Sequence, residues 1–142
     1  MDNKELLGTL CNALEISDAN LTEIIQLSGH TLVEGELATC SDRVVRMFLE
    51  GLIVSERGPR EDGAAIVLED AALTNNQILK KLRIALNLQE LDMLAIFEEG
   101  EVELSASEFG ALFRKENNKH YRPCSDELLQ RFLAGLTPSL DV

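Results

Sequence analysis

The residues of this 142-residue chain best suited to chemistry lie near its C-terminal end. His120 and Cys124 are separated by three residues, a spacing at which an imidazole and a thiolate can bind one metal ion. The same two side chains could act as base and nucleophile if the segment between them folded back. Structural zinc needs four ligands, and the sequence offers no partner pair at a comparable spacing. We therefore predict no metal, no cofactor and no catalytic residues.

A basic segment in the same region is the second candidate. Residues 114–122 carry four basic side chains and one glutamate, a formal +3 in a chain of net charge −12, which leaves −15 on the rest. The predicted interaction surface consists of Arg114, Lys115, Lys119, His120, Tyr121 and Arg122. Exposed ion pairs contribute little to stability. Two interpretations remain open: these side chains bind an acidic partner, or they neutralise Glu and Asp in the first half of the same chain.

The sequence around this segment repeats. Seven of the thirteen aligned positions are identical between residues 40–52 and 124–136, beginning with Cys-Ser-Asp in both. The match continues upstream, where Asn3 corresponds to Asn75 at an offset of 72, against 84 for the cysteines. The second copy therefore has twelve extra residues, and they coincide with the basic segment. A tandem repeat predicts two helical units packed into one pseudo-symmetric body.

Apolar residues recur at steps of three and four, which predicts an all-α fold with four helices in a full repeat. We expect residues 3–14, 18–28 and 41–56 to match residues 75–87, 90–98 and 125–136 through an approximate twofold axis. The central apolar residues of this fold are expected to be Phe48, Leu49, Phe132 and Leu133.

Helix starts carry capping signals. Thr74 with Gln77, and Ser105 with Glu108, have the spacing of a capping box. The repeated serines at 41 and 125 are expected to accept hydrogen bonds from the first-turn amides of the next helix. Asn75 and Asn76 could bind an anion at a helix N-terminus, but asparagine is also an ordinary capping residue and we adopt that interpretation.

Three glycines have expected roles. The apolar stripe of the first copy continues past Gly51, so we place this glycine and its equivalent Gly135 inside helices, where another backbone packs closely. The alternative is that both terminate helices. Gly100 is expected to end the preceding helix in a left-handed conformation.

The repeat defines the predicted organisation: a first repeat at residues 1–57, a linker at 58–73 and a second repeat at 74–142, with both repeats sharing one core. The linker contains Gly, Pro and charged residues, and its apolar run 64–68 is expected to lie across the body in an extended form.

Composition excludes several classes. No apolar run approaches the roughly 20 residues of a membrane helix, and the N-terminus lacks the apolar core of a signal peptide. The net charge opposes nonspecific binding to nucleic acid or anionic membranes. Three cysteines without paired spacing favour reduced thiols, and we expect a cytoplasmic protein.

Three stretches of the chain, at 73–89, 113–124 and 132–136, closely resemble the YehS-like family of uncharacterised bacterial proteins, domain of unknown function 1456. The resemblance covers nearly the whole chain. It implies tandem helical repeats and no assigned activity. The family pattern has a Trp-Leu and charged stretch before the first-copy cysteine, whereas this chain contains no Trp. The first repeat is therefore expected to be abbreviated, with its third helix in question.

Two functions fit these patterns. The first is a noncatalytic interaction module that presents residues 114–122 to an acidic protein or to a second copy of itself. The alternative is a nucleic-acid-binding protein that uses residues 89–98 and 105–115 as a helix-turn-helix, with Arg114 and Lys115 near phosphates and Tyr121 stacked on a base. An enzyme is the third choice, because pockets can assemble residues that are distant in sequence.

Overall fold

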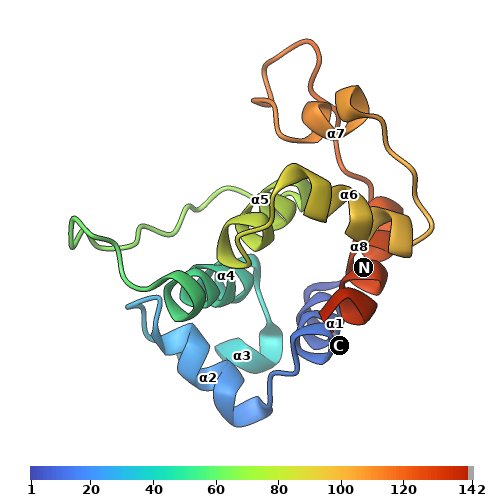
Figure 1. Cartoon of the computed structure of the whole chain (residues 1–142). Coiled ribbons are helices and arrows are strands. Elements are labelled where there is room, and N and C mark those ends of the chain that lie inside the picture. The colour runs from blue at the N-terminus through green and yellow to red at the C-terminus, as the bar shows by residue number, and fades with distance from the viewer. Residues whose placement is uncertain (141–142) are drawn as a thin grey trace.

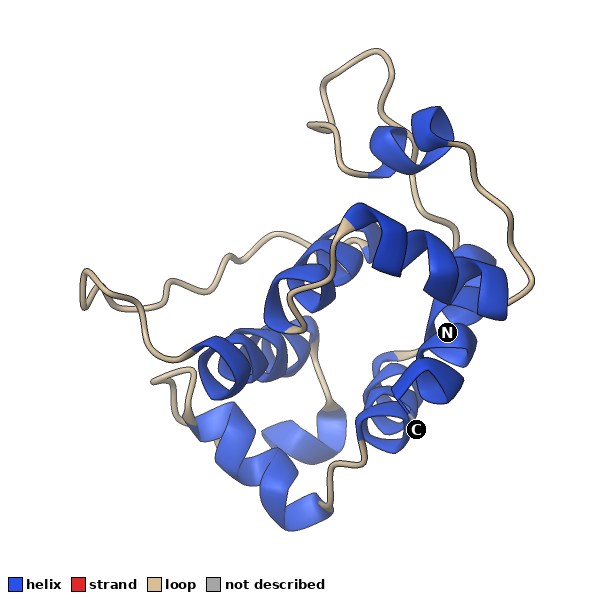
Figure 2. Cartoon of the chain, viewed as in Figure 1, coloured by secondary structure: helices blue, strands red, loops and turns tan. Residues whose placement is uncertain are grey.

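The computed structural model describes residues 1–140, and within this range the chain forms helices and loops but no strand (Figures 1 and 2). In chain order the helices are α1 (Asn3–Leu14), α2 (Asp18–Gln26), α3 (Glu36–Thr39), α4 (Asp42–Arg57), α5 (Asn75–Ala85), α6 (Glu90–Glu99), α7 (Ala106–Leu112) and α8 (Asp126–Leu140). The predicted all-α class is confirmed. No helix in the described range is long and apolar enough to cross a membrane.

The long helices enclose one hydrophobic core (Figure 1). Helix α2 packs on α4 and α6 packs on α8, while α4 contacts α5 and α8 contacts α1. Phe97 of α6 and Phe132 of α8 pack on each other within the core with ring centroids 5.0 Å apart, and neither is exposed. Phe48, Leu49 and Leu133 are also buried, as expected. Burial of these aromatic and aliphatic side chains is the main force that stabilises the fold.

The predicted capping boxes are present in the second half. The Thr74 hydroxyl accepts from the Gln77 amide at 3.2 Å, and the Gln77 side chain accepts from the Thr74 amide at 3.1 Å. Ser105 and Glu108 make the same reciprocal pair at 3.1 and 3.0 Å. These bonds satisfy amides that have no partner within the helix, so they fix where α5 and α7 begin.

The repeated serines differ. The Ser125 hydroxyl accepts from the Leu128 amide at 3.1 Å, as expected. Ser41 stands at the same position before α4, but its hydroxyl accepts no capping bond. The expectation for Ser41 was wrong because the Val44 amide bonds the Ser41 carbonyl oxygen instead, at 3.0 Å.

Gly51 and Gly135 lie inside α4 and α8, which confirms the mid-helix interpretation. A Cβ at either position would overlap the carbonyl group of Ile24 or of Ile96, in the helix packed against it. The expectation for Gly100 was wrong: its φ is −83°. Its Cβ would overlap the carbonyl of Arg131, so the glycine is required by helix packing rather than by a left-handed cap.

The connections differ from the expected boundaries in detail. Helix α2 ends at Gln26, two residues early, and α8 continues past residue 136 to Leu140. The third helix of the first half exists as the single turn α3. The segment 58–73 forms neither helix nor strand, but the Ile66 carbonyl oxygen lies 2.6 Å from His30 Nε2, which attaches the segment to the body.

Helix α7 rests on α5 through an arginine. The Arg83 guanidinium lies 5.3 Å from the ring centroid of Phe109 and 5.1 Å from that of Phe113, and the two rings are 4.9 Å apart. Arg83 also donates to the Leu88 carbonyl oxygen at 3.2 Å. A guanidinium on aromatic faces both packs and attracts electrostatically, so it holds α7 on the body.

Candidate interaction surface

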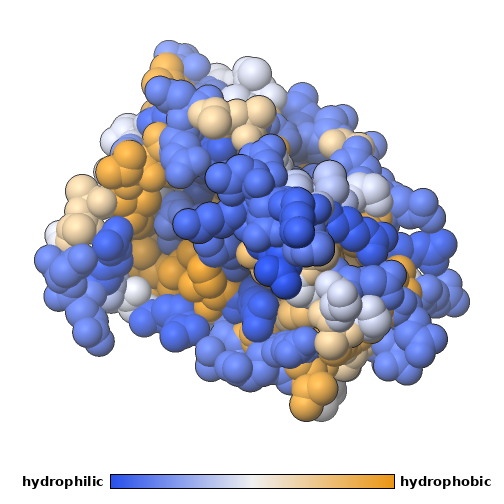
Figure 3. Space-filling view, turned by 90° about the horizontal axis from the view of Figure 1, so that it is seen from above, coloured by the Kyte–Doolittle hydropathy of each residue, from blue (hydrophilic) through white to orange (hydrophobic). Residues whose placement is uncertain are grey.

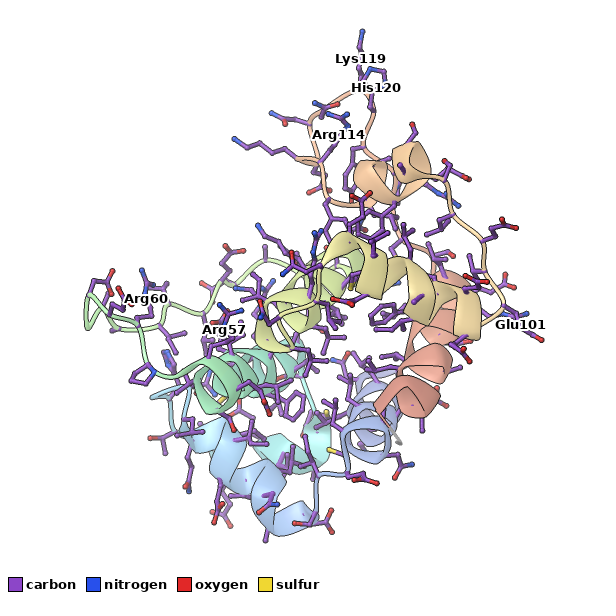
Figure 4. The ribbon with its side chains drawn as sticks, in the orientation of Figure 1. Arg57, Arg60, Glu101, Arg114, Lys119 and His120 are labelled. Carbon is purple, nitrogen blue, oxygen red and sulfur yellow. The ribbon has the colours of Figure 1, made fainter. Side chains whose placement is uncertain are left out.

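The basic segment is an ordered loop that projects from the body between α7 and α8 (Figure 1). Two successive turns shape it: the Asn118 amide donates to the Lys115 carbonyl at 2.9 Å, and the Tyr121 amide donates to the Asn118 carbonyl at 3.0 Å. The Asn118 side chain also accepts from the His120 amide at 2.8 Å. Lys119 and His120 therefore stand at the outer tip (Figure 4).

A buried asparagine holds both ends of this loop. Asn76, in the first turn of α5, is 9% exposed. Its side-chain amide donates to the carbonyl oxygens of Leu112 and Arg122, at 3.0 and 2.8 Å. Its side-chain oxygen accepts from the Cys124 amide at 2.8 Å. The Arg122 amide also donates to the Ala111 carbonyl oxygen at 3.0 Å. These four bonds close the loop at its base, and the cations project beyond them.

Sequence reasoning treated Asn76 as a capping residue, which was wrong, because Thr74 is the cap. A signal was available: Asn75 repeats Asn3, but Asn76 stands where the first half has Lys4. An asparagine found in the half that also contains the extra residues is a candidate to support them. Asn75 itself donates to the Cys124 carbonyl at 3.0 Å, so its amide group is engaged within the protein.

The charges of the loop are mostly unpaired. Arg122 lies 3.6 Å from Glu108 of α7, and both side chains are about half exposed. The pKa of Glu108 is lowered chiefly by its hydrogen bonds from Ser105, with a smaller contribution from Arg122. In the described part of the chain Arg114, Lys115 and Lys119 form no salt bridge. The loop therefore makes no ion pair with the first half over residues 1–57.

A cavity of about 290 Å³ lies between the loop and α5, and we call it the loop pocket. Arg114 and Lys115 line it from the loop, Lys80 lines it from α5, and Glu116 contributes one carboxylate. Tyr121 is half-buried against this pocket, and burial raises the pKa of its phenol. The side chain thus forms part of the wall. The face that carries the loop is mainly hydrophilic, with hydrophobic residues visible to one side of it (Figure 3).

The histidine and cysteine at 120 and 124 have different environments. His120 is exposed at the loop tip, whereas Cys124 is 6% exposed beneath it. Burial raises the pKa of the Cys124 thiol to about 11, so the thiolate is scarce at neutral pH. Cys40 is buried at the equivalent position in the first half, and the three cysteines are free thiols.

The two helices proposed for DNA or RNA contact are short. Helices α6 and α7 are connected by residues 100–105, and α7 is seven residues long. Its exposed side chains are Ala106, Ser107 and Glu108, and none of them is positively charged. Arg114 and Lys115 lie beyond its end, in the loop. The arrangement offers no basic recognition helix in this part of the chain.

These features define an all-helical protein with a projecting basic loop. Residues 75–139 match the family described as "Protein of unknown function (DUF1456)". The chain is also 42% identical over 97 residues to "Uncharacterized protein YehS" of Escherichia coli (strain K12), over 68% of this chain and 62% of that protein. No solved structure matches it. The chain therefore belongs to the YehS-like family, and the resemblance seen in the sequence is confirmed. The matched part of the chain spans 62% of the length of that relative.

Proposed function

We propose that this protein is a noncatalytic helical interaction module whose basic loop, residues 114–122, binds an acidic protein partner. One observation carries the proposal: three exposed cations of the loop have no ion pair in the described part of a chain whose net charge is −12. A positive patch on a negative protein attracts acidic surfaces selectively and repels basic ones. A second copy of this acidic chain is the other partner that the charge pattern accommodates.

The alternative role for these cations is neutralisation of the first half, and the observed contacts give it little support. The ion pair that the loop makes is Arg122 with Glu108, which lies in the second half. Exposed pairs of this type contribute at most about 1 kcal/mol. Arg114 and Lys119 point outward, away from the helices of residues 1–57 (Figure 4). Stability therefore does not account for the accumulation of positive charge.

We further propose that residues 1–57 and 74–142 are two repeats related by an approximate twofold axis, joined by the linker 58–73 around one core. The packing pairs α2 with α4 and α6 with α8, and the equivalent glycines of α4 and α8, support this. Two residues separate α3 from α4, whereas residues 113–125 separate α7 from α8. The basic loop is thus the largest departure from the repeat, which favours a role in binding over one in folding.

The proposal places the protein in the cytoplasm with a protein partner. Nucleic acid is the less favoured partner, because the exposed face of α7 has no positively charged side chain and the few cations of the loop lie beside Glu116. A polyanion would also meet the field of the remaining −15 charges.

The test is affinity capture with matched charge reversals. The loop variant is Arg114→Glu with Lys119→Glu. The control is Lys4→Glu with Arg60→Glu, which changes the net charge equally at two exposed sites outside the loop. Tagged proteins are incubated with cell lysate, with and without nuclease, and thermal unfolding is measured in parallel.

We expect the wild type and the control to retain the same partner protein after nuclease treatment, and the loop variant to lose it while its melting temperature stays within a few degrees. Retention by the loop variant would refute the proposal. Loss of the partner on nuclease treatment would transfer the function to nucleic-acid binding.

A further inference from the structure

A second cavity, of about 170 Å³, lies beside the loop pocket, and we call it the arginine pocket. Helix α4 forms one wall, the end of the linker a second and α5 the third. Gln77 and Lys80 of α5 line both cavities, so the two are neighbours along this helix. The arginine pocket connects the first half of the chain to the basic loop of the second.

Arg46 of α4 makes this pocket unusual. The side chain is 9% exposed, and one Nη donates to the Ala71 carbonyl oxygen at 2.7 Å. Among the described residues no carboxylate forms a salt bridge with it. Asp42, one helical turn before it, has its two oxygens occupied by the Asn3 side chain and the Leu73 amide, both at 2.9 Å.

Asp42 attracts Arg46 through space, but no carboxylate of the described residues bonds the guanidinium, and a guanidinium buried to this degree without a bonded carboxylate carries a desolvation cost. A bound anion would offset that cost, because the planar fork of arginine bonds a carboxylate through two N–H groups. The Ala71 carbonyl oxygen accepts from one of the five donors of Arg46, and the residue lines the cavity. Arg46 therefore has the properties of an anion receptor.

The remaining polar walls support this. Lys80 and Lys81 are cationic, Glu50 is paired with Lys81, and Glu69 is an exposed carboxylate at the rim. With Arg46 the pocket has three positive and two negative groups, in a chain that is acidic elsewhere. The other walls are leucine and valine side chains, against which methylene groups can pack.

The size and charges of the pocket select the ligand. A volume of about 170 Å³ is below the range of roughly 300–1,000 Å³ typical of small-molecule sites, and suits one side chain better than a nucleotide. The carboxylates of Glu50, Glu69 and Glu116 lie along the path of the two cavities and would repel a continuous phosphate backbone. An acidic peptide can place its carboxylates between them.

We propose that the arginine pocket receives a glutamate or aspartate side chain of an acidic peptide segment, which continues past Lys80 into the loop pocket. The inference rests on the proposed function and deepens it, because it specifies the partner as an extended acidic segment and Arg46 as its anchor. It also gives the two halves of the chain a shared binding site.

The probe is a blocked, fluorescein-labelled eight-residue peptide in which glutamate alternates with glycine, so that its carboxylates are spaced, with inorganic phosphate as a separate titrant. Peptide affinity is measured by fluorescence anisotropy at about 50 and 150 mM salt, because screening separates surface attraction from binding in a pocket. The side-chain Nε–H resonance of Arg46 is followed by NMR in the unmodified protein and assigned with Arg46→Lys. The titration itself is carried out on the unmodified protein.

Two variants of the arginine pocket should change peptide affinity in opposite senses. Arg46→Lys keeps the charge and removes the fork; Arg43→Lys makes the same change on α4 outside the pocket. Glu69→Gln removes a competing charge at an exposed site and should leave folding unchanged; Glu61→Gln is its control in the linker. We expect Arg46→Lys to weaken peptide binding by about tenfold, since bonds to charged groups are the strong ones. Glu69→Gln should tighten it by about twofold to fivefold, and neither control should change it.

A saturable shift of the Arg46 resonance by the peptide, with these changes, supports the proposal. Peptide binding without a response from Arg46 or Glu69→Gln would overturn it and leave the proposed function of the loop intact. A response to phosphate but not to peptide would overturn it in favour of a small-anion site. The absence of any peptide binding would also overturn it, whereas the proposed function is decided by the partner capture described above.

Discussion

The Asn75 side-chain amide donates a hydrogen bond of 2.7 Å to the Asp126 carboxylate, and this bond has a counterpart in the other half of the molecule. Asn3 donates to Asp42 at 2.9 Å in the same way. Each asparagine also donates at 3.0 Å to the carbonyl of the cysteine two residues before its aspartate. The starts of α1 and α4, and of α5 and α8, are therefore joined identically.

Each aspartate also accepts a hydrogen bond from a residue of the other half of the chain. The second oxygen of Asp42 accepts from the Leu73 amide at 2.9 Å, two residues before Asn75. The second oxygen of Asp126 accepts from the Met1 nitrogen at 3.1 Å, two residues before Asn3. The bonds and the two short chain segments form a closed circuit. Four helix N-termini meet there, where a carboxylate is favoured by the helix dipoles.

Acid should weaken this circuit. The Asn3 amide, followed by the Leu73 amide, lowers the pKa of Asp42, and Asn75 similarly lowers that of Asp126. A carboxyl group whose pKa is lower when folded stabilises the fold above its unfolded pKa, near 4, and that contribution is lost as the pH falls toward the folded pKa. We expect the free energy of unfolding, from urea titrations between about pH 2 and 7, to fall below about pH 4.

The variant that tests the origin of this loss is Asp42→Asn, which should show a shallower acid dependence than the wild type. Asp18→Asn, an exposed aspartate outside the circuit, is the control. An unchanged slope in Asp42→Asn would assign the acid sensitivity to other carboxyl groups.

Helix packing at Gly135 predicts a sign reversal between two identical substitutions. Gly135→Ala should destabilise the protein by about 1–3 kcal/mol, because its Cβ overlaps the Ile96 carbonyl and forces α6 and α8 apart. Gly8→Ala, at an exposed position of α1 with no neighbour within 4 Å of a Cβ, should instead stabilise by roughly 0.5–1 kcal/mol through helix propensity. Chemical denaturation measures both. A stabilised Gly135→Ala protein would mean that the helices are less tightly packed than described.

Local sequence patterns predicted the helices well and their packing less well. Thr74 and Ser105 start helices because the capping bonds are made within four residues, so their pattern is visible in the sequence. Gly100 was assigned to a left-handed cap because glycine commonly ends helices. Its actual constraint is the Arg131 carbonyl, about thirty residues away, and no local pattern contains that information.

The candidate site likewise combines features that are visible in the sequence with features that depend on tertiary packing. The cations of residues 114–122 could be identified from composition and from the extra length of the second repeat. Arg46 could not, since an arginine in an amphipathic helix is ordinary in sequence, and the one sequence signal for Asn76 was its difference from Lys4 in the first half. Their roles come from burial against loop carbonyls and at a cavity, which depend on how α4, α5 and the loop assemble.

The core predicts a large effect at Phe132. Phe132→Ala removes a fully buried ring that packs on Phe97, and large-to-small changes of this type cost about 3–5 kcal/mol. Such a loss is a large fraction of the roughly 5–15 kcal/mol that keeps a domain of ordinary stability folded. Leu91→Ala, where the side chain is 80% exposed, is the control and should change stability by less than about 0.5 kcal/mol. Equal effects in urea denaturation would place Phe132 outside the core.

The thiols should react in a defined order. Denatured protein should show three reactive cysteines, because none is in a disulfide. In the native state Cys11 is the most accessible and should be labelled first, while Cys124, buried with a pKa raised to about 11, should react much more slowly at pH 8. Mass spectrometry after timed alkylation gives the order. Rapid native labelling of Cys124 would show that the loop above it opens readily.

Loss of the Asn76 side chain should release the basic loop. Asn76→Ala leaves the Leu112 and Arg122 carbonyls and the Cys124 amide without their partner, and each unsatisfied buried group costs about 1–3 kcal/mol. We expect reduced stability together with faster hydrogen exchange over residues 113–124, beyond the rise in the helices. Asn118→Ala removes one exposed bond within the loop and is the matched control. If exchange of the loop were the same in both variants, the loop would be held by its own turns, and Asn76 would serve only to fix α5 against α8.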